Sequence, residues 1–178
     1  GLVGSEMCIR DRIAASATVA WFATRQVRSV VDRSRPYVRR RADPAHPVLI
    51  INPASGDGTT AQLDLEAAAR DAGIEVVRLG DGGDLGELAR DAIGAGADAI
   101  GVAGGDGSVG QVAAVAIAHD VAFFCVPTGT RNHFALDLGL DRDDPLRALD
   151  ALRGGDEVLI DHGRAGDRVF VNNASFGL

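Results

Sequence analysis

Three short segments of the 178-residue sequence combine glycine with polar side chains in a pattern that suits phosphate binding. Glycine lacks a Cβ atom, so backbone N–H groups can close around phosphate oxygens, and a helix that begins at such a loop favours negative charge at its N-terminus. The segments are Asn52, Pro53, Ala54, Ser55 and Gly56; Gly104, Gly105, Asp106, Gly107, Ser108, Val109 and Gly110; and Thr130, Arg131, Asn132 and His133.

Two charged residues in these segments indicate how phosphate would be held. Asp106 alone would repel phosphate, but carboxylate and phosphate oxygens together are what Mg²⁺ prefers, so we predict Asp106 as a metal ligand. A solvated turn residue is the alternative. Arg131 can pair with phosphate through two parallel hydrogen bonds. His133 either binds substrate or metal, or is an ordinary surface residue.

Other phosphate-binding motifs do not fit the sequence. All 18 basic residues are arginine, which excludes a P-loop with its lysine. Gly105, Gly107 and Gly110 match the dinucleotide pattern G-x-G-x-x-G, but they follow the third expected strand instead of the first. The next strand also lacks an acidic residue at its end. Both points argue against an NAD-dependent oxidoreductase.

Composition narrows the function further. The net charge of -7 divides unevenly, because residues 1–46 carry nine arginines against four acids, or +5, and the rest carries nine against 21, or -12. An acidic body with 4% aromatic residues argues against a nucleic-acid partner. Cys8 and Cys125 cannot form a disulfide framework, which fits a reducing compartment, and Cys125 is expected to be a buried thiol.

Alternating elements must position the glycine segments. Short apolar runs with helical patterns between them predict a Rossmann-like open parallel sheet with flanking helices, an α/β fold. In such sheets ligands bind beyond the carboxyl ends of the strands, where the glycine segments lie. The expected strands are 48–51, 74–79, 97–103 and 121–126, the helices are 60–72, 84–95 and 108–119, and a short helix at 144–153 precedes a hairpin around 163–167.

We divide the chain into four parts. Residues 1–12 resemble translated sequencing-adapter sequence and are set aside as a probable artefact; 13–46 form a basic helical leader and linker; 47–155 form the α/β domain; and 156–178 begin a truncated β-rich domain. We therefore expect a fragment of a longer protein. The apolar run 13–23 is shorter than the about 20 residues that span a bilayer. It is either a solvated helix or the remnant of a membrane anchor whose arginines meet anionic lipid.

The motifs NPASG, GGDGS, PTGTRNHFA and VNNASFG, in this order, resemble the catalytic domain of the diacylglycerol kinase family, which includes sphingosine and ceramide kinases. NAD kinases are more distant relatives. The resemblance covers residues 47–178. The sequence has Ser108 where the family usually has threonine, and Arg131-Asn132-His133 where it usually has Gly-Asn-Asp.

The resemblance implies an ATP- and Mg²⁺-dependent kinase that phosphorylates a lipid hydroxyl such as that of diacylglycerol. It implies that residues 52–56 touch the nucleotide, that 104–110 cradle its phosphates with Asp106 near the metal, and that Thr130 and Asn132 complete the pocket. The family's general base is expected beyond Leu178, so this chain alone is expected to be inactive. We therefore expect a cytoplasmic protein, which would lie at the inner membrane surface if the leader binds there. A non-catalytic nucleotide-binding module and an NAD kinase-like enzyme remain alternatives, and the sequence leaves the oligomeric state open.

Overall fold

The computed structural model describes residues 37–40, 42–55, 59–154, 156–166 and 168–171. The chain divides into two compact units between Tyr37 and Val38, and Val38–Leu178 forms the second of them. The predicted artefact 1–12 and most of the predicted leader lie outside the described residues. Within the described ranges, no helix is both long and apolar enough to cross a membrane.

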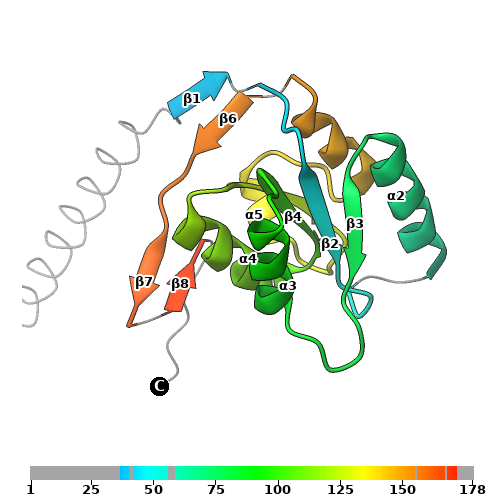
Figure 1. The fold of residues 1–178 in the computed structure, drawn as a ribbon, viewed down its shortest axis with the longest axis horizontal. Coiled ribbons are helices and arrows are strands. Elements are labelled where there is room, and N and C mark those ends of the chain that lie inside the picture. Colours follow the sequence, from blue (N-terminus) through cyan, green and yellow to red (C-terminus); the bar gives the residue numbers. More distant parts are fainter. Residues whose placement is uncertain (1–36, 41, 56–58, 155, 167, 172–178) are drawn as a thin grey trace, which may run out of the picture. The chain divides into compact units, whose positions relative to one another are not determined.

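A four-stranded parallel sheet forms the centre of this unit (Figure 1). Its strands are β2 (Pro47–Ile51), β3 (Glu75–Arg78), β4 (Ala99–Gly104) and β5 (Ala122–Pro127), in the order β3-β2-β4-β5. Every residue of β2 and β4 is buried, as expected for apolar strands covered on both faces. The predicted open parallel sheet is therefore confirmed.

Helices cover both faces of the sheet and create two separate apolar cores. Helices α3 (Leu85–Gly94), α4 (Asp106–His119) and α5 (His133–Asp137) pack on the face that carries Ile50 and Val102. Helix α2 (Thr59–Asp71) and the 3-10 helix η1 (Pro145–Leu152) pack on the face that carries Leu49, Ile51 and Val126. Odd and even residues of one strand thus serve different cores, as the alternation of side chains requires.

Two elements differ from the prediction near the site. Helix α4 begins at Asp106, two residues before the predicted start at Ser108, so most of the second glycine segment is helical. Helix α5, which has only five residues, was not predicted. The causes differ: polar and glycine residues at the start of α4 dilute its apolar pattern, and α5 is too short to show a period.

The small strands outside the main sheet also correct the prediction. Tyr37–Arg40, within the segment 13–46 predicted as a helical leader, forms strand β1 and pairs with β6 (Asp156–Leu159). The predicted hairpin is confirmed as β7 (Gly163–Ala165) and β8 (Arg168–Phe170), although 163–165 were expected to be turn. Strand β8 packs against α4. A second domain stays a prediction.

A partly buried ion pair joins α2 to the edge strand β3. The Glu66 side chain, 8% exposed, accepts a hydrogen bond from the Arg78 Nε atom and lies 3.3 Å from the Arg70 guanidinium. Both arginines are considerably more exposed than the carboxylate. This pair therefore helps to hold α2 against the edge of the sheet.

Replacement of Glu66 tests this attachment. Glu66→Ala should lower the free energy of unfolding by about 1–2 kcal/mol, because it removes charge-assisted hydrogen bonds that are only partly screened by solvent. Arg70→Ala, which removes the more exposed partner, should cost about 0.5 kcal/mol or less. Urea denaturation of the three proteins measures both effects. Equal losses in the two variants would contradict the central position of Glu66.

Candidate functional site

The register of the sheet brings the three glycine segments together at the carboxyl ends of the strands. Ile51 at the end of β2 is paired with Ala103 of β4, and Gly104 at the end of β4 is paired with Pro127 at the end of β5. The loops that follow these strands therefore emerge side by side. From β2 the chain continues to α2 on one face of the sheet, and from β4 it continues to α4 on the other. This divergence is the switch point at which open α/β sheets bind ligands.

The first loop is tied to the second through Asn52. Its backbone N–H donates to the Ala103 carbonyl oxygen over 3.1 Å, which extends the β2–β4 pairing by one residue. Its side-chain Nδ2 atom donates to the Ser108 Oγ atom over 2.9 Å, and its Oδ1 atom accepts from the Ala54 N–H. Ser108 is buried. The Asn52 amide thus connects two loops of the protein.

The second and third loops meet backbone to backbone. A Cβ atom built on Gly129 would lie 2.3 Å from the Gly105 Cα atom and 2.9 Å from its nitrogen, so only glycine fits at position 129. The Asp106 Oδ1 atom accepts a hydrogen bond from the Phe134 N–H over 3.1 Å. Asp106 is in the first turn of α4 and Phe134 in the first turn of α5, so the carboxylate joins the two helices at their starts.

Asn132 closes the turn that contains Gly129. Its Oδ1 atom accepts from the Gly129 N–H at 3.0 Å, and its Nδ2 atom donates to the Gly129 carbonyl oxygen at 2.6 Å. The side chain is buried, and the backbone is left-handed with φ 53°, a conformation that asparagine tolerates better than most residues. Thr130 and Arg131, between these two residues, are exposed at the tip of the turn.

The start of α4 is suited to an anion. Gly105 is the N-cap residue and supplies no side-chain hydrogen bond, so the first backbone N–H groups of this 14-residue helix lack a side-chain cap. Space for a Cβ atom at Gly107 is open, and the residue is exposed. Backbone N–H groups and a helix dipole together favour a phosphate group here.

The predicted site residues divide by what their side chains contact. The side chains of Asn52, Ser108, Asp106 and Asn132 each bond to another part of the protein. Pro53 and Ala54 are exposed, Ser55 is half-buried with its Oγ atom 3.6 Å from a Cβ atom built on Gly104, and Gly56 lies outside the described residues. Gly129 and the Phe134 N–H were not among the predicted site residues. A glycine in each of two neighbouring loops was the signal that could have pointed to Gly129.

The donor set near Asp106 suits Mg²⁺ only in combination with a ligand. No cluster of three or more histidine, cysteine, aspartate or glutamate side chains that could hold a metal occurs among the residues the structure describes. Mg²⁺ is commonly bound by one or two carboxylates plus phosphate oxygens and water. One carboxylate beside a helix start that is suited to an anion fits that pattern, and the donors present are therefore compatible with an ion shared between Asp106 and a polyphosphate.

Cys125 lies beneath the same loops but has no reactive character. It is buried in β5, as predicted, and burial, with a smaller contribution from the Asp106 charge, raises the pKa of its thiol to about 12. The thiol therefore stays protonated at neutral pH, which excludes Cys125 as a nucleophile. The influence of Asp106 also indicates that this carboxylate lies near β5.

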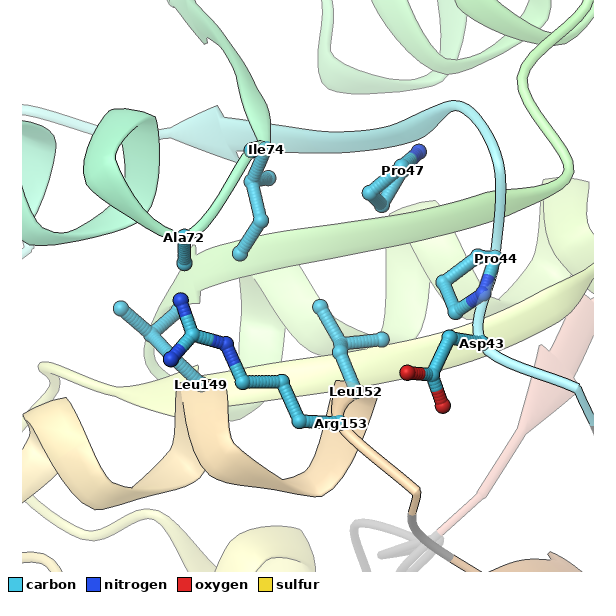
Figure 2. Close-up of a pocket in the computed structure, with 9 residues that line it drawn as sticks. Asp43, Pro44, Pro47, Ala72, Ile74, Leu149, Leu152 and Arg153 are labelled. Atoms are coloured by element: carbon cyan, nitrogen blue, oxygen red, sulfur yellow. The ribbon is translucent and has the colours of Figure 1, made fainter.

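A cavity of about 290 Å³ lies on the opposite side of the sheet from the glycine segments, at the amino ends of the strands (Figure 2). Pro47 at the start of β2 and Ile74 just before β3 line it, and Ile74 and Leu152 point into it from opposite sides. Asp43 and Arg153 contribute the charged groups. None of the predicted site residues that the structure describes lines this cavity, which is at the amino ends of the strands.

Comparison with known proteins supports the resemblance seen in the motifs. Residues 46–165 match the family model described as the diacylglycerol kinase catalytic domain. A curated protein of Mycobacterium tuberculosis (strain CDC 1551 / Oshkosh) named diacylglycerol kinase is 34% identical over 132 residues, which cover 72% of this chain and 43% of the relative. One from Bacillus subtilis (strain 168) with the same name is 35% identical over 82 residues, which cover 45% of this chain and 27% of the relative.

A solved structure has the same fold. A crystal structure described as a diacylglycerol kinase from Bacillus anthracis str. Sterne matches with a TM-score of 0.63 and 21% sequence identity, over 73% of this chain and 47% of that one. The chain therefore spans less than half the length of the curated relatives it matches and of this structure.

Two glycine substitutions test how the loops are packed. Gly129→Ala should lower the free energy of unfolding by about 1–3 kcal/mol, because its Cβ atom would collide with the backbone of Gly105. Gly107→Ala should leave it unchanged or raise it by up to about 1 kcal/mol, because the new Cβ atom meets open space in a helix. Thermal and urea unfolding measure both. A stable Gly129→Ala protein would contradict the backbone contact.

Proposed function

Because the chain belongs to the diacylglycerol kinase catalytic domain family, we propose that it is the nucleotide-binding portion of an ATP-dependent lipid kinase. The reaction is transfer of the γ-phosphate of ATP to a lipid hydroxyl, such as that of diacylglycerol. Phosphoryl transfer depends mostly on positioning and on neutralising charge. The residues described above supply the phosphate side of that task.

The observation that carries the proposal is the meeting of three glycine-containing loops at one edge of the sheet. The start of α4 offers N–H groups for phosphate oxygens, and the neighbouring loops after β2 and β5 flank it. Side-chain bonds from Asn52 and Asp106 hold the three loops in fixed relation. A preformed arrangement lowers the conformational cost of binding a flexible polyphosphate.

Mg²⁺ belongs to the same proposal. Asp106 would hold the ion together with phosphate oxygens, and the bound ion would neutralise charge on the transferring phosphoryl group. The Asp106 carboxylate also keeps α5 in place through the Phe134 N–H. Its role is thus double: it positions the third loop, and it provides a metal ligand.

The acceptor side of the reaction is assigned to other parts of the protein. We place the general base and the lipid-binding surface beyond Leu178, as the family resemblance implies. The arginine-rich segment 25–41 would add contact with an anionic membrane surface.

Substitution of Asp106 by asparagine separates its two roles. Asparagine retains an Oδ1 acceptor for the Phe134 N–H, so the thermal midpoint should change little. Loss of the charge should weaken binding of Mg-ATP about 10- to 100-fold by calorimetry. Binding of ATP in the presence of EDTA should stay the same or become tighter, because a repelling carboxylate is gone. Equal weakening with and without Mg²⁺ would remove Asp106 as a metal ligand.

Transfer of labelled phosphate from ATP distinguishes the kinases. The longest open reading frame that contains this chain should phosphorylate diacylglycerol in mixed micelles and should leave NAD unlabelled. Labelling of NAD alone would favour the NAD kinase-like alternative. Mg-ATP binding without transfer to either acceptor would favour a non-catalytic nucleotide-binding module.

A further inference from the structure

The three loops contain few charges. Among their described residues, 52–55, 104–110 and 127–135, the side chains with a fixed charge are Asp106 and Arg131, and His133 adds a titratable group. The sequence contains no lysine to add a cation. Without Arg131 these loops would carry a net negative charge, which opposes the binding of a polyphosphate.

Arg131 is also free to meet a ligand. It is exposed, and it forms no ion pair with any residue that the structure describes. Its neighbour Asn132 is buried, with both ends of its amide bonded to the Gly129 backbone. Asn132 was predicted to complete the nucleotide pocket, but these two hydrogen bonds suit a residue that shapes the turn.

The turn places Arg131 near the start of α4. Gly129 is in contact with the Gly105 backbone, and Phe134 is bonded to Asp106, so both sides of the turn are attached to the second loop. Arg131 lies between these two attachments, two residues after Gly129 and three before Phe134. A long arginine side chain on a turn attached at both sides to the second loop can extend toward a phosphate held at the start of α4.

Building on the proposed function, we propose that Arg131 binds the polyphosphate of the nucleotide and that Asn132 is the positioning residue that holds the turn for it. A guanidinium group can form two parallel hydrogen bonds to phosphate oxygens and remains charged at any physiological pH. It would offset the Asp106 carboxylate when the metal is absent and share the phosphate charge with Mg²⁺ when the metal is bound.

Calorimetry with the 178-residue chain tests the assignment with three probes: Mg-ATP, inorganic tripolyphosphate and adenosine. Arg131→Gln should weaken Mg-ATP and tripolyphosphate about 10- to 100-fold and leave adenosine unchanged. Arg131→Lys keeps the charge but loses the planar fork, so its affinity for both polyphosphates should lie between those of the unmodified chain and Arg131→Gln. Asn132→Asp keeps the acceptor for the Gly129 N–H but sets a buried carboxylate against the Gly129 carbonyl oxygen, so it should weaken tripolyphosphate and also lower the unfolding temperature, while the folded protein should bind adenosine as before.

Arg142→Gln is the matched control. Arg142 is half-exposed, lies outside the three loops and is 3.9 Å from the neighbouring Asp143 carboxylate, so its loss changes the net charge equally. The assignment is overturned if tripolyphosphate affinity falls equally in Arg131→Gln and Arg142→Gln, or if it falls in neither. Binding to vesicles with anionic phosphatidylglycerol that falls in Arg131→Gln while tripolyphosphate affinity is retained also overturns it, in favour of a lipid headgroup. Failure of the unmodified chain to bind Mg-ATP and tripolyphosphate would overturn the proposed function as well.

Discussion

The close approach of two backbones, at Gly105 and Gly129, is the constraint on which the rest of the site depends. Parallel pairing aligns the ends of β4 and β5, but side chains would normally keep the following loops apart. Glycine at both positions removes that barrier. The Asp106 carboxylate can then reach the Phe134 N–H, and the third loop becomes continuous with the start of α4. Without the contact, the sheet would still form but the loops would not make one surface.

Polar side chains at the site serve mainly to hold loops together. Asn52 is hydrogen-bonded to Ser108, Asp106 accepts a hydrogen bond from the Phe134 N–H, and Asn132 closes the turn at Gly129. Each of these bonds satisfies groups that are at least partly removed from water, so the arrangement is stable without a ligand. What remains available for binding is the backbone at the start of α4 and the exposed tip of the third loop.

Sequence patterns predicted the sheet well because its information is local. The apolar runs that became β2, β4 and β5 are each bounded by glycine, proline or polar residues, and parallel strands need little else. Short elements were missed: α5 has five residues and β1 four, too few to show a period. The partners of Asp106 and Asn132 were equally hidden, since a spacing along the chain does not reveal which backbone N–H will be 3 Å away. The site residues could be gathered from their motifs, but their individual tasks could not.

The glycine content of the chain has a wider explanation than phosphate binding. Six described glycines, among them Gly73 and Gly139, have positive φ and form turns that end helices or reverse the chain. Gly101 lies in the middle of β4 because the ring of Phe124 on the neighbouring strand occupies the space of its Cβ atom. Glycine near the carboxyl edge of the sheet therefore has to be judged by its contacts. Gly129 is required because a side chain there would collide with a neighbouring backbone. At Gly107 a side chain would meet open space, so no contact within the protein explains the glycine, and a bound ligand can.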